Sequence, residues 1–169
     1  MNLEQINFHL DAYKENDQIL DAARFLIRNF DLEHENFAGF DFREELETNG
    51  LLLTAEGELG EPQTVKIPRN LFDFNLDLVL NMVAHEMLHV RQKDPNSLVE
   101  DKNEREFQAY YEMLFHKTFP QVPVLSAFYI KQFGAKALEY YKRMGEGSEL
   151  QTKYTEQKKE VEDLIASQS

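Results

Sequence analysis

The sequence predicts an α+β fold in which a small antiparallel sheet packs on one buried helix. Three observations support this prediction. Apolar residues recur at helical spacing near both ends of the chain, they alternate with polar residues in a short central stretch, and they fill almost every position of residues 76–92. We therefore expect helices, then strands, then the buried helix, then further helices.

The first thirty residues have the pattern of amphipathic helices. Apolar side chains within residues 3–13, and again within residues 19–30, are three or four positions apart, which is the spacing of one helix face. The polar pair Asn16-Asp17 interrupts the pattern. We expect two helices here, or one helix broken near this pair.

The period changes to two in the next part of the chain. Phe40 and Phe42 alternate with charged neighbours, and segments 51–54 and 64–67 flank the turn-rich residues 56–62. This pattern predicts antiparallel strands joined by a loop. Because proline is tolerated at a strand end and disrupts a central strand, Pro68 makes Val65-Lys66-Ile67 the candidate edge strand. The alternative is an ordinary hairpin that packs its apolar face on the following helix.

Residues 76–92 leave almost no polar face, which predicts a helix buried on most sides. Asn75 or Asp73 could cap its first turn. The pair Asp94-Pro95 should end it, because the residue before a proline is pushed away from helical angles.

This helix contains His85-Glu86-Met87-Leu88-His89, a motif of the form H-E-x-x-H. Two histidines four residues apart stand one turn above each other, so both imidazoles can face one metal ion. Glu86 lies beside them, where it could take a proton from a water on the same metal. The alternative is two core histidines bonded to backbone carbonyls. We favour the metal site because so buried a helix penalises unpaired polar groups.

A catalytic zinc ion needs a third protein ligand and an open position for water. A second helix is expected to begin after residue 100 and to run to about Thr118. If Asn103 caps it, Glu106 has capping-box spacing; if Asp101 caps it, Glu104 has that spacing. The helical wheel does not choose between the two glutamates, because they flank the buried face on opposite sides. The candidate ligands in this segment are Glu100, Asp101, Glu104 and Glu106, whereas His9, His34 and His116 are expected to be solvated.

The remainder of the chain is expected to be helical, from about Val124 to Met144 and from about Glu149 to Ala166, with Gly145-Glu146-Gly147 between the two helices. Its tyrosines could donate to an oxyanion, although core or rim positions are the commoner fate of such residues. Neither an internal repeat nor a linker is evident, so residues 1–169 are expected to form a single domain.

The two motif-bearing helices resemble those of the gluzincin metallopeptidases, in particular the CaaX prenyl protease core, the soluble minigluzincins and the ImmA-type repressor-cleaving proteins. The resemblance covers roughly residues 76–116. These families place the third ligand in E-x-x-A-D or E-x-x-A-N, and Glu106-Phe107-Gln108-Ala109 matches the first four positions. The match favours Glu106 over Glu104. Tyr110 stands where those families have an acidic or amide residue that orients a metal-bound histidine.

The resemblance implies a zincin-like fold and zinc-dependent hydrolysis of peptide bonds. In such folds a small sheet lies over the metal-binding helix, and its edge strand pairs with an extended peptide or protein substrate. His85, His89 and Glu106 would bind the zinc ion (Zn2+), and Glu86 would be the general base acting on a metal-activated water. The alternative is a regulatory or structural protein-binding module whose metal site has limited or no peptidase activity.

Composition limits the partners and the ligand chemistry. Lys and Arg total 18 against 31 Asp and Glu, giving a net charge of -13, so neither nucleic acid nor an anionic membrane surface is an expected partner. The chain has no cysteine, which restricts metal ligands to nitrogen and oxygen. The start of the chain lacks a signal-like segment, and no apolar stretch has membrane-spanning length. These features lead us to expect a soluble, cytoplasmic protein.

Overall fold

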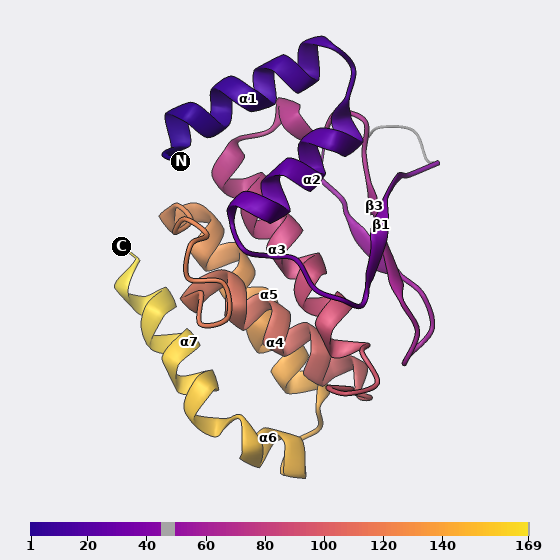
Figure 1. Ribbon diagram of the computed structural model, residues 1–169. Helices are drawn as coiled ribbons and strands as arrows, with labels where there is room; N and C mark the ends of the chain where they lie inside the picture. The colour runs from indigo at the N-terminus through magenta and orange to yellow at the C-terminus, as the bar shows by residue number, and fades with distance from the viewer. Residues whose placement is uncertain (45–49, 169) are drawn as a thin grey trace.

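The computed structural model describes residues 1–44 and 50–168, and these residues form an α+β fold with seven α-helices and one three-stranded mixed sheet (Figure 1). A short 3-10 helix, η1, precedes the central helix. The elements are α1 (Leu3–Glu15), α2 (Ile19–Asn29), β1 (Phe37–Phe42), β2 (Thr54–Glu56), β3 (Gln63–Ile67), η1 (Leu71–Asp73), α3 (Leu76–Gln92), α4 (Lys102–Phe115), α5 (Ala127–Arg143), α6 (Glu149–Lys153) and α7 (Thr155–Ser167).

The N-terminal segment forms two helices, as predicted. A capping box starts α1, in which Asn2 and Gln5 each accept a hydrogen bond from the backbone of the other. Asp17 follows the helix with a φ of 54°, a left-handed conformation that ends helical bonding and turns the chain into α2.

The sheet has the strand order β1-β3-β2, with β1 parallel and β2 antiparallel to β3. The predicted antiparallel pairing across residues 56–62 is confirmed by β2 and β3, although β2 begins only at Thr54. The predicted all-antiparallel sheet is wrong, because β1 pairs parallel to β3. The predicted edge strand is also wrong, because Val65-Lys66-Ile67 lies in the central strand. Pro68 does not disturb this strand, since it follows the last paired residue and its missing N–H falls outside the ladder. The edge strand beside α3 is β2.

Helix α3 runs through the middle of the molecule, with α2 and the sheet on one side and α4 and α5 on the other (Figure 1). Val79, Leu80 and Val83 face the cluster of buried apolar residues shared with α1, α2 and the sheet, whereas Leu78 joins the cluster of α4, α5 and α7. Burial on both sides explains why its sequence has almost no polar face. The predicted bounds of this helix and its Asn75 cap are confirmed.

Helix α4 begins at the cap Asp101, whose side chain accepts a hydrogen bond from the backbone N–H of Glu104. Asn103 is thus not the cap. The helix ends at Phe115, before the predicted Thr118, because His116 adopts a left-handed conformation with a φ of 48°. The predicted C-terminal helix is two helices, α6 and α7, which meet at the buried Tyr154.

Among the described residues, no helix combines the length and apolar character needed to cross a membrane.

Candidate metal centre

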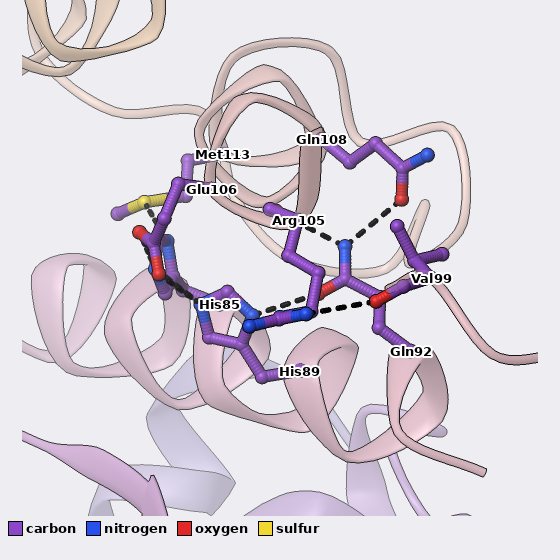
Figure 2. A network of polar contacts seen from close by, with 8 residues as sticks. All are labelled: His85, His89, Gln92, Val99, Arg105, Glu106, Gln108 and Met113. Carbon is purple, nitrogen blue, oxygen red and sulfur yellow. Dashed lines mark hydrogen bonds and ion pairs between the residues drawn. The ribbon is translucent and has the colours of Figure 1, made fainter. Parts of the chain in front are cut away.

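The fold brings His85, His89 and Glu106 together in a group that could hold a metal ion. The two histidines are buried on α3, and Glu106 approaches them from α4 (Figure 2). The Nε2 atoms of the two imidazoles are 3.1 Å apart. Glu106 Oε1 lies 3.0 Å from His89 Nε2, and Glu106 Oε2 lies 3.6 Å from His85 Nε2. Two imidazole nitrogens and one carboxylate, donors of the types that zinc prefers, therefore converge on one point.

The spacing of these donors matches the size of a metal ion. With metal–ligand bonds of about 2.0–2.1 Å in tetrahedral geometry, two ligand atoms lie roughly 3.3–3.4 Å apart. The two Nε2 atoms are 3.1 Å apart, and each lies 3.0 or 3.6 Å from one of the two oxygens of Glu106, so the observed separations bracket this value. The residues thus fit a tetrahedral ion with three protein ligands and a fourth position left for water.

The tautomer of His89 is determined by Gln92. The amide nitrogen of Gln92 donates to the backbone oxygen of Arg105 and to Gln108 Oε1, so its oxygen remains to accept from His89 Nδ1 at 2.7 Å (Figure 2). A neutral His89 that donates through Nδ1 directs the Nε2 lone pair at a carboxylate oxygen of Glu106. Two facing acceptors at 3.0 Å require a proton or a metal cation between them.

His85 has a weaker orienting partner. Its Nδ1 lies 3.2 Å from Met113 Sδ, a poor acceptor, where a carboxylate, amide or carbonyl oxygen usually stands beside a metal-bound histidine. Tyr110 does not replace that oxygen, because it packs its ring against the imidazole with centroids 4.6 Å apart. The orientation of His85 is thus held by packing more than by hydrogen bonding.

The electrostatics of the three donors are coupled. Burial opposes ionisation of Glu106, but hydrogen bonds and the charges of His85 and His89 hold the pKa of that carboxyl well below its usual range. Burial also opposes the charged form of His89, yet the bond to Glu106 and the field of Glu86 raise its pKa. In the absence of metal, a proton shared between His89 and Glu106 supplies the positive charge that a metal ion would otherwise provide.

Glu86 lies in the same pocket, a cleft of about 310 Å³ lined by residues of α3, α4, β2 and the segment just before β2, and by Phe133 of α5. The side chain is buried, and this burial raises the pKa of the Glu86 carboxyl. The backbone N–H of Ala55, on the edge strand β2, donates to it and partly offsets the rise. A carboxylate with a raised pKa beside a metal position is suited to accept a proton from a water molecule.

Glu104, the other glutamate considered as a third ligand, points away from the imidazoles. Its Oε2 accepts hydrogen bonds from Lys153 Nζ at 2.7 Å and from the hydroxyl of Tyr154. The geometry thus brings Glu106, and not Glu104, to the histidines. Asp101 is used as a helix cap, and Glu100 is exposed.

The remaining histidines lie outside the group. His9 packs against Phe8 and Phe25, and His34 lies 3.7 Å from Asp94. All three are half-buried rather than fully solvated as predicted. His116 Nε2 lies 2.7 Å from Asn81 Oδ1, and burial lowers the pKa of His116.

Sequence reasoning missed the residues that orient the histidines. Gln92 is three positions after His89, on the next turn of the same helix face, and that spacing could have identified it. Gln108 and Met113 reach the site only through the packing of α4 on α3, for which the sequence offers no comparable signal.

The role of Gln92 is testable. We expect Gln92→Leu to weaken zinc binding about 10- to 100-fold, as removal of an outer partner of a metal-bound histidine usually does. A zinc titration against a competing chelating dye measures the affinity. Gln132→Leu, the same change at an exposed position of α5, is the matched control and should bind zinc like the unaltered protein. Equal affinities for the two variants would contradict the assignment of Gln92.

No protein-family model, curated protein or solved structure matches this chain.

Proposed function

We propose that this protein is a zinc metallopeptidase with a zincin-like fold of the gluzincin type. The observation that carries the proposal is the convergence of His85, His89 and Glu106 within one cleft that also contains Glu86. Two imidazoles and one carboxylate, with room for a fourth ligand, are the donor set of catalytic zinc sites in several peptidases.

The chain's own residues then have distinct roles. His85 and His89 would hold the ion through Nε2, and Glu106 through its carboxylate. When bound there, zinc would activate a water molecule and polarise the scissile carbonyl. Glu86 would accept a proton from the attacking water as the new C–O bond forms and would pass it to the leaving amine as the C–N bond breaks. Gln92 keeps His89 in the tautomer that presents its Nε2 lone pair.

Removal and return of the metal tests this proposal. The purified protein, loaded with one equivalent of zinc, is expected to cleave casein or a mixed peptide library, because water activation depends on the ion. Treatment with a chelator should abolish cleavage, and added zinc should restore it. Product formation is followed by mass spectrometry. Cleavage that continues undiminished after the metal has been removed would refute the proposal.

One observation favours a second candidate, a protein-binding module whose metal site has little or no peptidase activity. His85 Nδ1 faces the thioether of Met113 instead of an oxygen, which leaves one ligand weakly oriented. This candidate predicts stoichiometric zinc without cleavage in the assay above. Measuring metal content and peptidase activity on the same preparation therefore distinguishes the two candidate functions.

A further inference from the structure

The cleft has two chemically different ends, and its geometry follows from the pairing of α3 with α4. The helices run antiparallel: Gln92 near the end of α3 contacts Arg105 near the start of α4, and His85 contacts Met113 further along. Residues one turn before and after the metal donors therefore lie at opposite ends of the cleft.

One end is cationic. Lys93 stands one turn beyond His89, Lys102 stands one turn before Glu106, and Arg105 precedes Glu106, and all three cations line the cleft. In the described part of the chain, none of the three has a carboxylate within ion-pair distance. This is a notable concentration in a chain with 31 acidic and 18 basic residues.

The contacts that these cations do make are with neutral groups. Lys93 Nζ donates to the backbone oxygen of Gly57 at 3.3 Å, and Arg105 Nη1 donates to the backbone oxygens of Val99 and Glu100. Burial lowers the pKa of Lys93, and the charge of Arg105 lowers it further, whereas the charges of Glu86, Glu58 and Glu106 raise it. Arg105 and Lys93 thus repel each other, and an anion bound between them would relieve that repulsion.

The other end of the cleft is apolar. Met82 lies one turn before His85, and Tyr110 lies one turn after Glu106. Tyr110 is held between His85 and the ring of Phe133, with which it stacks at 6.0 Å. These side chains form an apolar surface suited to an aliphatic or aromatic side chain.

We propose that the cleft selects peptides that carry a carboxylate on one side of the scissile bond and an apolar side chain on the other. The carboxylate binds Lys93, Lys102 and Arg105, and the apolar side chain packs on Met82, Tyr110 and Phe133. This inference rests on the proposed function, because the scissile bond is placed at the metal donors.

The dimensions of helices and extended peptides indicate how far the substrate carboxylate lies from the scissile bond. One turn of α3 spans about 5.4 Å, whereas an extended peptide advances about 3.3 Å per residue. Lys93 and Lys102 are each one turn from a metal donor, so the acidic group lies one or two residues from the scissile bond. Its source is either an acidic side chain or the C-terminal carboxylate of a peptide.

Internally quenched peptides test the selection. Each peptide has an Ala-Gly background and one Leu, and the expected scissile bond either follows or precedes this Leu. Glu, Gln or Lys is placed one or two residues beyond that bond. In a second set, the peptide ends at this position in a free acid or an amide. We expect kcat/KM to be about tenfold higher for the acidic member of a pair, and the acid–amide pair identifies a C-terminal source. Raising the salt from 50 to 500 mM should reduce the charge preference, because exposed charges are screened.

The double variant Lys93→Gln/Lys102→Gln should lose the preference for Glu over Gln, measured as the ratio of kcat/KM for the two peptides. Lys131→Gln/Lys159→Gln has the same charge change at exposed positions of α5 and α7, outside the cleft, and should keep the preference. A preference of equal size in both double variants would overturn the inference.

Binding separates failure of this inference from failure of the proposed function. Fluorescence anisotropy of the labelled Leu-Glu and Leu-Gln peptides with the zinc-loaded Glu86→Gln variant reports recognition without cleavage. Cleavage with no acid preference overturns the inference and leaves the peptidase function intact. Lysine-dependent binding of the acidic peptide without cleavage overturns the function and supports peptide recognition by the cationic end. If the peptides are neither bound nor cleaved, both the inference and the proposed function are overturned.

Discussion

Replacing Glu86 with glutamine is expected to leave zinc content unchanged and to lower kcat about a thousandfold. The amide has nearly the same size as the carboxylate but cannot accept the proton of the attacking water, and general base catalysis contributes about 10²- to 10⁴-fold. Because Glu86 lies beside the donor atoms and is not one of them, the metal group should persist. Zinc is measured by elemental analysis, and hydrolysis is measured with the best quenched peptide.

The matched control is Glu156→Gln, the same change at an exposed position of α7. It should retain both zinc and the full rate. If Glu86→Gln also hydrolyses peptide at the full rate, another group is the base and the proposed division of roles is wrong.

The alanine variants of Glu106 and Glu104 are expected to show opposite defects. Glu106→Ala removes one of three converging donors and should lower zinc affinity by more than the roughly 100-fold upper range typical of an outer partner. Glu104→Ala should bind zinc nearly normally but lose about 1–3 kcal/mol of unfolding free energy, because the buried hydroxyl of Tyr154 then lacks its carboxylate partner.

Zinc titration and urea unfolding, the latter in the presence of a chelator, give both quantities for each variant. The pair controls for the loss of a glutamate from α4, since the two positions are two residues apart on one helix. Normal zinc affinity in Glu106→Ala, or loss of zinc in Glu104→Ala, would show that the third donor has been misassigned.

The central helix was predictable because its signals are local. Continuous apolar character, the Asn75 cap and the Asp94-Pro95 stop all lie within or beside it. The position of β3 was not predictable in this way. Its parallel partner β1 is about 25 residues earlier, and parallel pairing has no turn motif that marks it in a sequence.

The choice between Glu104 and Glu106 required the same kind of distant information. Both residues are compatible with a helix start, and a pattern of capping residues treats them alike. The partners that occupy Glu104 are Lys153 and Tyr154, about 50 positions later, on helices that the sequence presents as one. The role of each glutamate therefore depends on which side chains distant in the sequence bind it.

The grouping of all three donors within residues 85–106 links metal capture to the way the chain folds. Closing so short a loop has a small entropic penalty, so the α3–α4 hairpin could bind an ion before the N-terminal helices and the sheet have docked. The same locality lets an unfolded chain retain some affinity for zinc, which reduces the stabilisation the ion provides. Zinc would then act in part as a nucleus for assembly, in addition to any role in turnover.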